Sequence, residues 1–408
     1  MIKQLYLFFI AVLAATDMQA QPSLRPAEAV PPMIGGDTTV SFVNFYPGSE
    51  IYELEGHSAL RLTMPEGDFA ISYGTYDFDQ PNFVYRFVKG ETDYWVTAVP
   101  WQYMVSHYLR DGRRIVEHRL DMTPEAKRRL VELVGENLRE ENRTYRYNYV
   151  LDNCATRPLR IAERALGDSI VLGRPADDVA ALGTFRDIMR RYHRNYPWYQ
   201  FGIDLALGSG IDRPVDNRMK AFAPVVLDAQ LAEATYGGKP LVKSVVVLND
   251  TEADAAIDRP TPCLLTPMAV SIYLLIFVIA MTVRDIRRGR VSRWLDAVLF
   301  GVYGLAGLLL TFLIFVSVHE ATSPNWLYLW LNPMCLVPTI FIWLKKCKTF
   351  VLSYQIVNFV AIVCLAIIWP WTHQSGNAAF VPLALCDLIR SANYIYLTLR
   401  EKNSKQCR

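Results

Sequence analysis

The first two thirds of this 408-residue chain almost lack cysteine. Cys154 is the only cysteine among the first 262 residues, and the other six all lie from position 263 onward. Because the start of the chain has the features of an export signal, this thiol is expected to face an oxidising compartment without a partner. A thiol retained there suggests nucleophilic catalysis, and the plainer alternative is a small buried side chain.

The sequence also lacks an excess of charge of one sign and the common motifs of metal and phosphate sites. Its formal net charge is +2, which gives no general attraction to nucleic acid. It has no Cys-x-x-Cys or His-Glu-x-x-His spacing and no glycine-rich phosphate loop. We therefore expect neither a metal nor another cofactor.

An apolar run near the N-terminus is too short for an ordinary membrane span. It extends from Leu5 to Ala15 after Lys3, which is typical of a secretory signal peptide over residues 1–20. The best cleavage site is Met18-Gln19-Ala20, and no cysteine follows the run, so it is not a lipoprotein signal. The alternative is a retained, tilted N-terminal anchor.

Apolar residues are concentrated after Pro260-Thr261-Pro262, where the composition changes from mixed and polar to mostly apolar. Five segments there are long enough to cross a bilayer, which takes about 20 residues. They are 264–283, 295–317, 326–344, 350–370 and 379–398. The sequence thus predicts an outer domain over 21–260, an all-α five-helix transmembrane bundle over 261–400, and a cytoplasmic tail over 401–408.

The charges of the linkers predict which side of the membrane each linker occupies. Lys and Arg follow the first, third and fifth segments, and linkers with such residues are normally cytoplasmic. Linkers 318–325 and 371–378 contain neither, so they should share the outer side with residues 22–262. The export signal predicts the same orientation, that of a bacterial inner-membrane protein with a periplasmic N-terminal domain.

Several polar residues of the apolar part are candidates for a functional role. Asp387 and Arg390 lie at helical spacing in the fifth segment, where charges usually face a bundle interior or a polar cavity. A plain ion pair between them that joins helices is the structural alternative. His319, Asn325 and His373 are expected at the outer membrane face, either as the floor of a site shared with the outer domain or as wetted loops.

The outer domain is predicted to combine strands and helices. The expected elements are strands at 57–63, 69–74 and 145–150 and helices at 123–141 and 155–166. Thr123 is the expected N-cap of the first helix, and Gly167 is the expected stop of the second. The third strand is predicted from tyrosines that alternate with other residues.

Cys154 falls between the tyrosine-rich strand and the following helix, at or next to a helix N-terminus. Orphan N–H groups and the helix dipole favour an anion there, so they would lower the pKa of the thiol and could hold an oxyanion. Asp152 and Asn153 are suitable N-cap residues. His57, beside Gly56 at the start of a core-facing strand, is the best candidate for the base, and a structural histidine is the alternative.

The other polar residues of this domain have less specific signals. Three further histidines lie in basic stretches and are expected at the surface: His107, His118 and His193. Arg157 and Arg160 lie one turn into the helix, where they would contact a lipid phosphate or a carboxylate such as Glu163. The candidates to orient His57 are Asp68, Ser72 and Tyr73.

The order of these residues, with the histidine before the cysteine, resembles that of circularly permuted papain-like enzymes, the permuted NlpC/P60 and lecithin:retinol acyltransferase group. More closely, the chain resembles the Bacteroides-type lipoprotein N-acyltransferases (Lnb) over nearly its whole length. The matching segments are Gly56-His57-Ser58-Ala59-Leu60-Arg61, Tyr73-Gly74-Thr75-Tyr76-Asp77-Phe78, Asp152-Asn153-Cys154-Ala155-Thr156-Arg157, Gly208-Ser209-Gly210-Ile211-Asp212-Arg213-Pro214, Asn325 through Asn332-Pro333, and Trp369-Pro370. The resemblance implies an α+β permuted papain-like periplasmic domain followed by a membrane bundle.

The resemblance also implies a reaction. Cys154 would be the nucleophile that accepts an acyl chain, and His57 would be its base. The donor would be a membrane phospholipid, and the acceptor would be the N-terminal amine of a diacylated lipoprotein. Two alternatives remain: a membrane-tethered cysteine peptidase or amidase that acts on cell-wall peptide, and a non-enzymatic envelope sensor or scaffold. A tether needs one span, so five predicted spans favour the acyltransferase.

Overall fold

The chain divides into two compact units. The computed structural model describes residues 38–77, 81–251 and 260–406, so the predicted signal peptide lies outside the described residues. The first unit, here the sheet unit, comprises the chain up to Phe87, residues 91–195 and residues 214–259. The second, here the helical unit, comprises Val88–Gly90, Tyr196–Arg213 and the chain from Pro260 onward. Residues 196–213 thus belong to the helical unit although they precede the change in composition.

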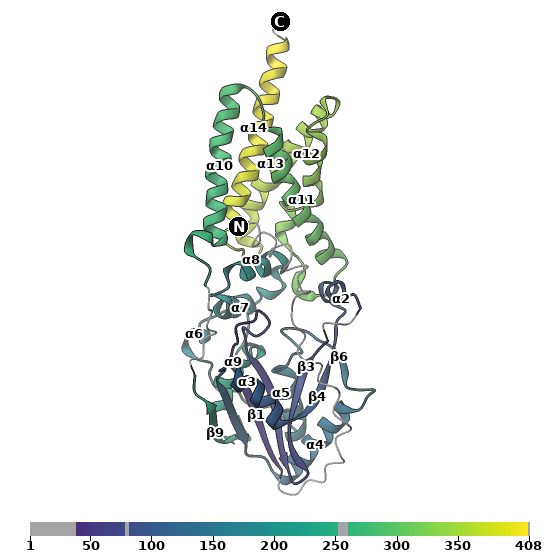
Figure 1. Ribbon diagram of the computed structural model, residues 1–408, viewed down its shortest axis with the longest axis vertical. Helices are drawn as coiled ribbons and strands as arrows, with labels where there is room; N and C mark the ends of the chain where they lie inside the picture. The colour runs from purple at the N-terminus through teal and green to yellow at the C-terminus, as the bar shows by residue number, and fades with distance from the viewer. Residues whose placement is uncertain (1–37, 78–80, 252–259, 407–408) are drawn as a thin grey trace. The chain divides into compact units, whose positions relative to one another are not determined.

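The sheet unit is built on a seven-stranded antiparallel sheet (Figure 1). Its strands are β1 (Thr39–Phe45), β2 (His57–Met64), β3 (Gly67–Thr75), β4 (Asp93–Pro100), β5 (Ile115–Leu120), β6 (Thr144–Arg146) and β9 (Val242–Asn249). Their order across the sheet is β6-β4-β3-β2-β1-β5-β9. The predicted hairpin is confirmed, since β2 pairs with β3 and the turn lies between Met64 and Gly67. A separate two-stranded ribbon pairs β7 (Thr235–Tyr236) with β8 (Lys239–Pro240).

The two faces of the sheet pack against different helices because side chains alternate along each strand. Phe42 and Leu60 lie on the face that forms the larger core with α4 (Pro124–Leu138), α5 (Thr156–Leu166) and α9 (Pro224–Ala232). Phe45 and Ala59 lie on the opposite face, which packs against α3 (Trp101–Arg110). The other helices of this unit are α2 (Phe83–Lys89), most of which belongs to it, α6 (Asp177–Ala180), α7 (Phe185–His193) and η2 (Met219–Phe222).

Two helix boundaries follow the predicted signals, and one predicted strand is shorter than expected. The Thr123 hydroxyl accepts the N–H of Ala126 at 3.2 Å, and Gly167 ends α5 in the left-handed conformation with φ 89°. The strand predicted at 145–150 is wrong beyond Arg146. Instead, the Asn148 side chain accepts the N–H groups of Val150 and Leu151 and so closes a turn.

Four long helices run alongside one another in the helical unit (Figure 1). They are α10 (Pro267–Arg288), α11 (Arg293–Phe315), α13 (Lys348–Ile368) and α14 (Phe380–Gln406). Among the described residues, three helical stretches are long and apolar enough to cross a membrane: Pro267–Arg288, Arg293–Phe315 and Lys345–Trp371. These correspond to the first, second and fourth predicted spans.

The third and fifth predicted spans have a different character. The third forms a shorter apolar stretch, Trp326–Phe341, made of η5 (Trp326–Leu329), η6 (Pro333–Cys335) and α12 (Leu336–Phe341). It breaks at Asn332 and Pro333 because proline cannot continue a helix from the preceding turn. The fifth is one continuous 27-residue helix that contains charged residues. A bundle of five spanning helices therefore stays a prediction.

The glycines at 208 and 210 allow two backbone segments of the helical unit to approach closely. The N–H of Gly208 donates to the carbonyl of Ala321, and the N–H of Ser209 donates to that of Pro324, each at 2.8 Å. A Cβ at Gly208 would lie 2.2 Å from the Pro324 oxygen. The Gly-Ser-Gly segment after α8 (Pro197–Ala206) thus has a packing reason, because only glycine leaves room for the neighbouring loop.

We predict that Gly307→Ala destabilises the helical unit, whereas Gly301→Ala on the same helix does not. A Cβ at Gly307 would lie 2.3–2.6 Å from backbone atoms of Asn332, but a Cβ at Gly301 would meet Thr339 at 3.4 Å, an ordinary contact. Overpacking of this kind costs about 1–3 kcal/mol. Thermal unfolding in detergent, followed by tryptophan fluorescence, should show a lower midpoint for Gly307→Ala only. Equal midpoints for the two variants would contradict the prediction.

Candidate active site

Cys154 lies in the turn between β6 and α5, with its side chain buried. The backbone N–H of Ser58 and the hydroxyl of Tyr147 both face the sulfur closely enough to favour its thiolate form. A Cβ added at Gly74 would lie 3.9 Å from the Cβ of Cys154, so the thiol also lies beside the end of β3. Cys154 therefore lies next to the first residues of β2.

Ser58 lies just before the β2–β3 ladder begins. That pairing runs from Met64 with Gly67 to Ala59 with Ser72, while on the other side of β2 Ser58 pairs with Asn44 of β1. Because Ser58 follows His57 directly, the approach of its N–H to the sulfur brings Cys154 to the start of the strand that contains the predicted base.

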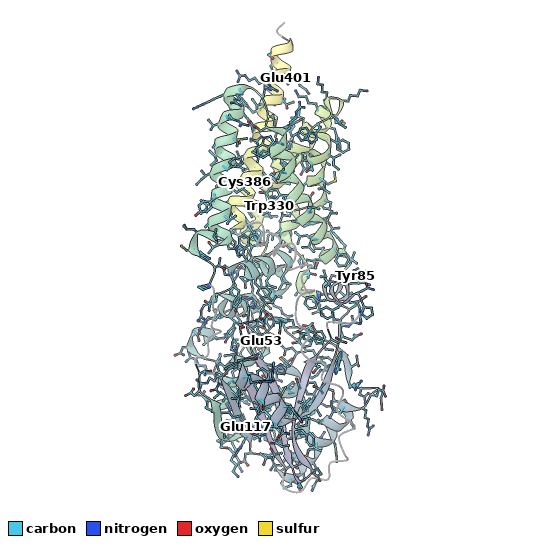
Figure 2. All side chains as sticks on the ribbon, viewed as in Figure 1. Glu53, Tyr85, Glu117, Trp330, Cys386 and Glu401 are labelled. Carbon is cyan, nitrogen blue, oxygen red and sulfur yellow. The ribbon has the colours of Figure 1, made fainter. Side chains whose placement is uncertain are left out.

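His57 is the first residue of β2 and pairs with Phe45 of β1. The preceding Gly56 has φ 79°, and a Cβ there would lie 2.4 Å from the carbonyl oxygen of Phe45. The close approach predicted for Gly56 is thus confirmed, and glycine is required by both the dihedral angle and the space. The loop before His57, marked by Glu53 in Figure 2, enters the strand through this glycine.

Ser72 is the residue that contacts the imidazole. Its Oγ lies 2.9 Å from Nε2 of His57. Alternation along β3 places Tyr73 on the opposite face, where it is buried in the core with α4 and α5. Asp68 pairs with Arg61 at 2.6 Å. Of the three residues predicted to orient His57, the structure brings only Ser72 to it.

Burial determines the protonation of both reactive groups. Desolvation raises the pKa of Cys154 to about 11, although the N–H of Ser58 and the Tyr147 hydroxyl oppose the shift. Desolvation, assisted by the charge of Arg113, lowers the pKa of His57 to about 4. The lowered thiol pKa expected from the helix N-terminus is therefore wrong for this state, because burial outweighs both opposing groups. At neutral pH the thiol and the imidazole are both uncharged.

The side chain of Asn153, which precedes α5, binds N–H groups at the start of this helix. Its Oδ1 accepts the N–H groups of Ala155 and Thr156 at 2.9 Å each, but the N-cap of α5 is Ala155, so the predicted N-cap position is two residues too early. Its Nδ2 donates to the carbonyl oxygens of Tyr149 and Phe222. The helix N–H groups that we expected to hold an oxyanion are therefore already paired. The backbone N–H groups that face the sulfur are those of Ser58 and Cys154.

Asp152 holds the two arginines of α5. Arg157 Nη2 lies 2.6 Å from Asp152 Oδ2, and Arg160 also pairs with this carboxylate. The Arg157 guanidinium additionally stacks on the Tyr145 ring at 3.6 Å. The carboxylate partner is thus Asp152 and not Glu163, which pairs with Arg218. Asp152 and Arg157 stabilise the turn that carries Cys154.

Sequence reasoning missed a buried glutamate beside the thiol. Glu55, two residues before His57, is 7% exposed and accepts a hydrogen bond from the Tyr149 hydroxyl. Its Oε1 lies 3.6 Å from Nε2 of His193, and its charge contributes to the raised pKa of Cys154. A glutamate in a polar loop gives no sign of burial by itself. The tyrosine and the histidine that enclose it come from distant parts of the chain.

Two histidines expected at the surface are buried. His193 and His118 are each 1% exposed. His193 ends α7, and its basic neighbour Arg191 lies on another side of that helix and is less buried. His118 lies on β5 beside the exposed Arg119, and its Nε2 is 2.7 Å from Asp228 Oδ1. The basic context misled the prediction because neighbours in sequence do not share a face. His107 is partly exposed, as predicted.

The charged residues of the last helix do not pair with each other. Arg390 binds Asp296 at 2.5 Å and Asp285 at 2.8 Å. Asp387 instead accepts hydrogen bonds from uncharged side chains: Trp330, Asn358 and Ser391. The ion pair considered between Asp387 and Arg390 is therefore wrong. The two residues lie in the interior of the helical unit, where Figure 2 marks the neighbouring Trp330 and Cys386.

The three candidates for the outer membrane face also belong to the helical unit. Asn325 is buried, donates to the carbonyl of Leu205 and accepts the amide of Gln374. His373 is exposed and has a positive φ of 56°. His319 precedes η4 (Glu320–Thr322) and caps it with its carbonyl. Asn325 thus joins the loop after α11 to the loop after α13.

No metal site emerges from the described part of the chain. Residues 38–77, 81–251 and 260–406 contain no group of three or more His, Cys, Asp or Glu side chains that could hold a metal ion.

Two family models match the chain. The model described as the Lnb N-terminal periplasmic domain matches residues 36–191, which include Glu55, His57 and Cys154. The model described as the Lnb transmembrane domain matches residues 259–402. Searches of curated proteins and of solved structures gave no match.

We predict that Cys154 reacts slowly with iodoacetamide at neutral pH and faster as the pH rises. Only the thiolate reacts, and a pKa of about 11 means that its fraction rises about tenfold per pH unit from pH 7 to pH 10. Peptide mass spectrometry of the folded protein in detergent measures the rate, and the exposed Cys263 serves as an internal comparison. A Cys154 rate that levels off near pH 8 would contradict the raised pKa.

Proposed function

Because this chain belongs to the Lnb family, we propose that it is an acyltransferase that moves a fatty acyl chain from a membrane phospholipid to the N-terminal amine of diacylated lipoproteins. The protein is a membrane protein with a periplasmic N-terminal domain. One observation carries the proposal within that family: the N–H of Ser58, the residue next to His57, faces the Cys154 sulfur and favours its thiolate form. Lipoproteins and phospholipids as partners are part of the proposal.

In the first half of the reaction, Cys154 attacks the carbonyl carbon of a phospholipid ester. His57 takes the thiol proton as the C–S bond forms, because both groups are uncharged at rest and the transfer must accompany the attack. The tetrahedral oxyanion would be stabilised by the N–H groups of Ser58 and Cys154. When the ester C–O bond breaks, His57 returns the proton to the departing oxygen. The products are an acyl thioester on Cys154 and a lysophospholipid.

In the second half, the uncharged amine of the lipoprotein attacks the thioester. The C–N bond forms, the C–S bond breaks, and His57 takes a proton from the nitrogen and returns it to the leaving sulfur. The result is an amide and a free thiol, so the enzyme regains its starting state. No oxidant, reductant or cofactor is needed for either half.

The finer fold and location are part of the same proposal. A permuted papain-like domain is supported by His57 at a strand start that precedes Cys154 at the entrance to α5. Trp326–Phe341 and α14 would complete a five-helix bundle in the bacterial inner membrane. The signal peptide at 1–20, the domains at 21–260 and 261–400, and the tail from 401 are retained as proposed boundaries.

The two alternative functions have less support. A peptidase or amidase on a tether needs one span, whereas the helical unit has three candidate spans and a buried ionic group around Arg390. A scaffold would require no acyl chemistry at Cys154. Slow alkylation at neutral pH would not favour a scaffold, because burial alone raises the pKa of the thiol.

We predict that Cys154→Ala abolishes N-acylation, since the thioester cannot form. In a host that depends on this protein, mass spectrometry should find its lipoproteins diacylated. The purified unchanged protein, mixed with phospholipid vesicles, should gain the mass of one acyl chain on Cys154, whereas Cys154→Ala should gain none. Normally triacylated lipoproteins in the Cys154→Ala strain would overturn the proposed function.

We predict that Ser72→Ala lowers the rate of thioester formation about fivefold, because it removes a hydrogen bond to His57 that is worth about 1 kcal/mol. Ser72→Thr keeps a hydroxyl at this position and should recover most of the rate. The measurement is the release of lysophospholipid in the first turnover. Equal rates for Ser72→Ala and Ser72→Thr would show that the hydrogen bond does not position the imidazole.

A further inference from the structure

Glu55 is the buried group beside the nucleophile that the two-step reaction above does not use. It is 7% exposed, and its Oε1 has no hydrogen-bond partner among the described residues. Its other oxygen accepts the Tyr149 hydroxyl. A buried carboxylate normally has its hydrogen bonds satisfied or has a cationic partner, so an oxygen left open in such a place calls for a ligand.

Two other buried carboxylates of the sheet unit show the contrast. Glu117 pairs with Arg61 at 2.9 Å and accepts the hydroxyl of Ser41. Asp228 binds His118 and accepts from Asn44 and Tyr46. For Glu55, no lysine or arginine of the described chain lies within ion-pair distance, and the nearest basic group is His193 at 3.6 Å.

The position of Glu55 links it to the thiol. Glu55, His57 and Ser58 belong to one short stretch around Gly56, and the latter two supply the imidazole and the N–H described above. The negative charge of Glu55 raises the pKa of both Cys154 and Tyr147, so its field reaches the sulfur and a side chain that faces it. The Glu55 carboxylate therefore lies near the Cys154 sulfur, just before the start of β2.

Tyr149 extends from the surface to the carboxylate. This tyrosine is 44% exposed, although its hydroxyl binds the buried Glu55. Exposed apolar side chains lie near it in sequence and on the loop before Glu55, namely Leu151, Ile51 and Tyr52. An acceptor whose reactive end is cationic and whose body is lipidic matches this combination of an apolar entrance and a buried negative charge.

The second half of the proposed reaction creates a need for such a group. An α-amine has a pKa of about 7.7–8.0, so at neutral pH most of it is an ammonium ion, which cannot attack a thioester. His57 is occupied with the proton that the nitrogen loses during the attack itself. One further proton must therefore leave the acceptor beforehand.

We propose that Glu55 binds the α-ammonium group of the acceptor and accepts its first proton, so that the free amine can attack the thioester on Cys154. This inference rests on the proposed acyltransferase function and deepens it. The carboxylate and the ammonium become a carboxylic acid and an amine. The amine nitrogen then bonds to the acyl carbon, the C–S bond breaks, and the second proton passes to the sulfur through His57.

Glu55 is suited to this exchange by its surroundings. Burial raises its pKa to about 7, while the Tyr149 hydroxyl partly opposes that shift. A carboxylate with this affinity for a proton can take one from an ammonium ion and release it again near neutral pH. The charged and titratable groups that face it are Tyr149, His193, Cys154 and Tyr147.

The test separates the two halves of the reaction in Glu55→Gln. The full-length protein in detergent is mixed with phospholipid and a synthetic diacylglyceryl-cysteine peptide, and mass spectrometry follows the thioester and the amide. We expect the thioester to form within about threefold of the normal rate and to accumulate, while amide formation at pH 7 falls about 100-fold, as for loss of a general base. The deficit should shrink as the pH rises to 9, where the acceptor is a free amine.

Three controls distinguish this role from a structural one. Hydroxylamine is an uncharged nucleophile at neutral pH, so Glu55→Gln should pass its acyl chain to hydroxylamine at the normal rate. Glu66→Gln, an exposed change in the turn between β2 and β3, should match the unchanged protein throughout. Glu55→Asp should recover part of the transfer, because it restores a carboxylate.

Several outcomes would overturn the inference without touching the proposed function. They are normal amide formation by Glu55→Gln at pH 7, an equal loss in both halves, a deficit that does not change with pH, or an equal deficit with hydroxylamine. Failure of the proposed function would look different, since the unchanged protein would then form no thioester on Cys154.

Discussion

The arrangement of the site depends on how β2 begins. Gly56 makes the chain turn sharply against β1, and His57 then starts the strand opposite Phe45. The next residue, Ser58, lies just before the pairing with β3, and its N–H faces the Cys154 sulfur. The start of one strand thus carries both the candidate base and a group that acts on the candidate nucleophile.

Burial then sets the chemistry of the groups gathered there. A thiol with a raised pKa and an imidazole with a lowered pKa are both uncharged at neutral pH, and each becomes charged only if a proton is transferred. Glu55 is also buried, and its Oε1 has no hydrogen-bond partner among the described residues. The site thus combines two neutral groups suited to an ester with one acid–base group suited to a cationic amine.

The helical unit also buries charged side chains, and it pairs each of them with a partner. Its buried Arg390 is compensated by Asp285 and Asp296, and its buried Asp387 by uncharged donors. Such groups are costly in an apolar interior unless each is paired, so they constrain how α10, α11 and α14 pack together. Close glycine contacts on α11 add a second constraint through space and not charge.

The sequence by itself determined the elements that depend on local chemistry: the hairpin, the capped helices, the apolar segments, and Cys154 and His57 as the reactive candidates. It also indicated the family, through short segments that the family models cover. It did not determine which neighbours meet: it placed His118 and His193 at the surface, left an Asp387–Arg390 ion pair open as an alternative, and gave no sign of Glu55. Those outcomes were decided only by the tertiary structure, because burial and partnership depend on residues far apart in the chain, and it is burial that sets the pKa of each reactive group.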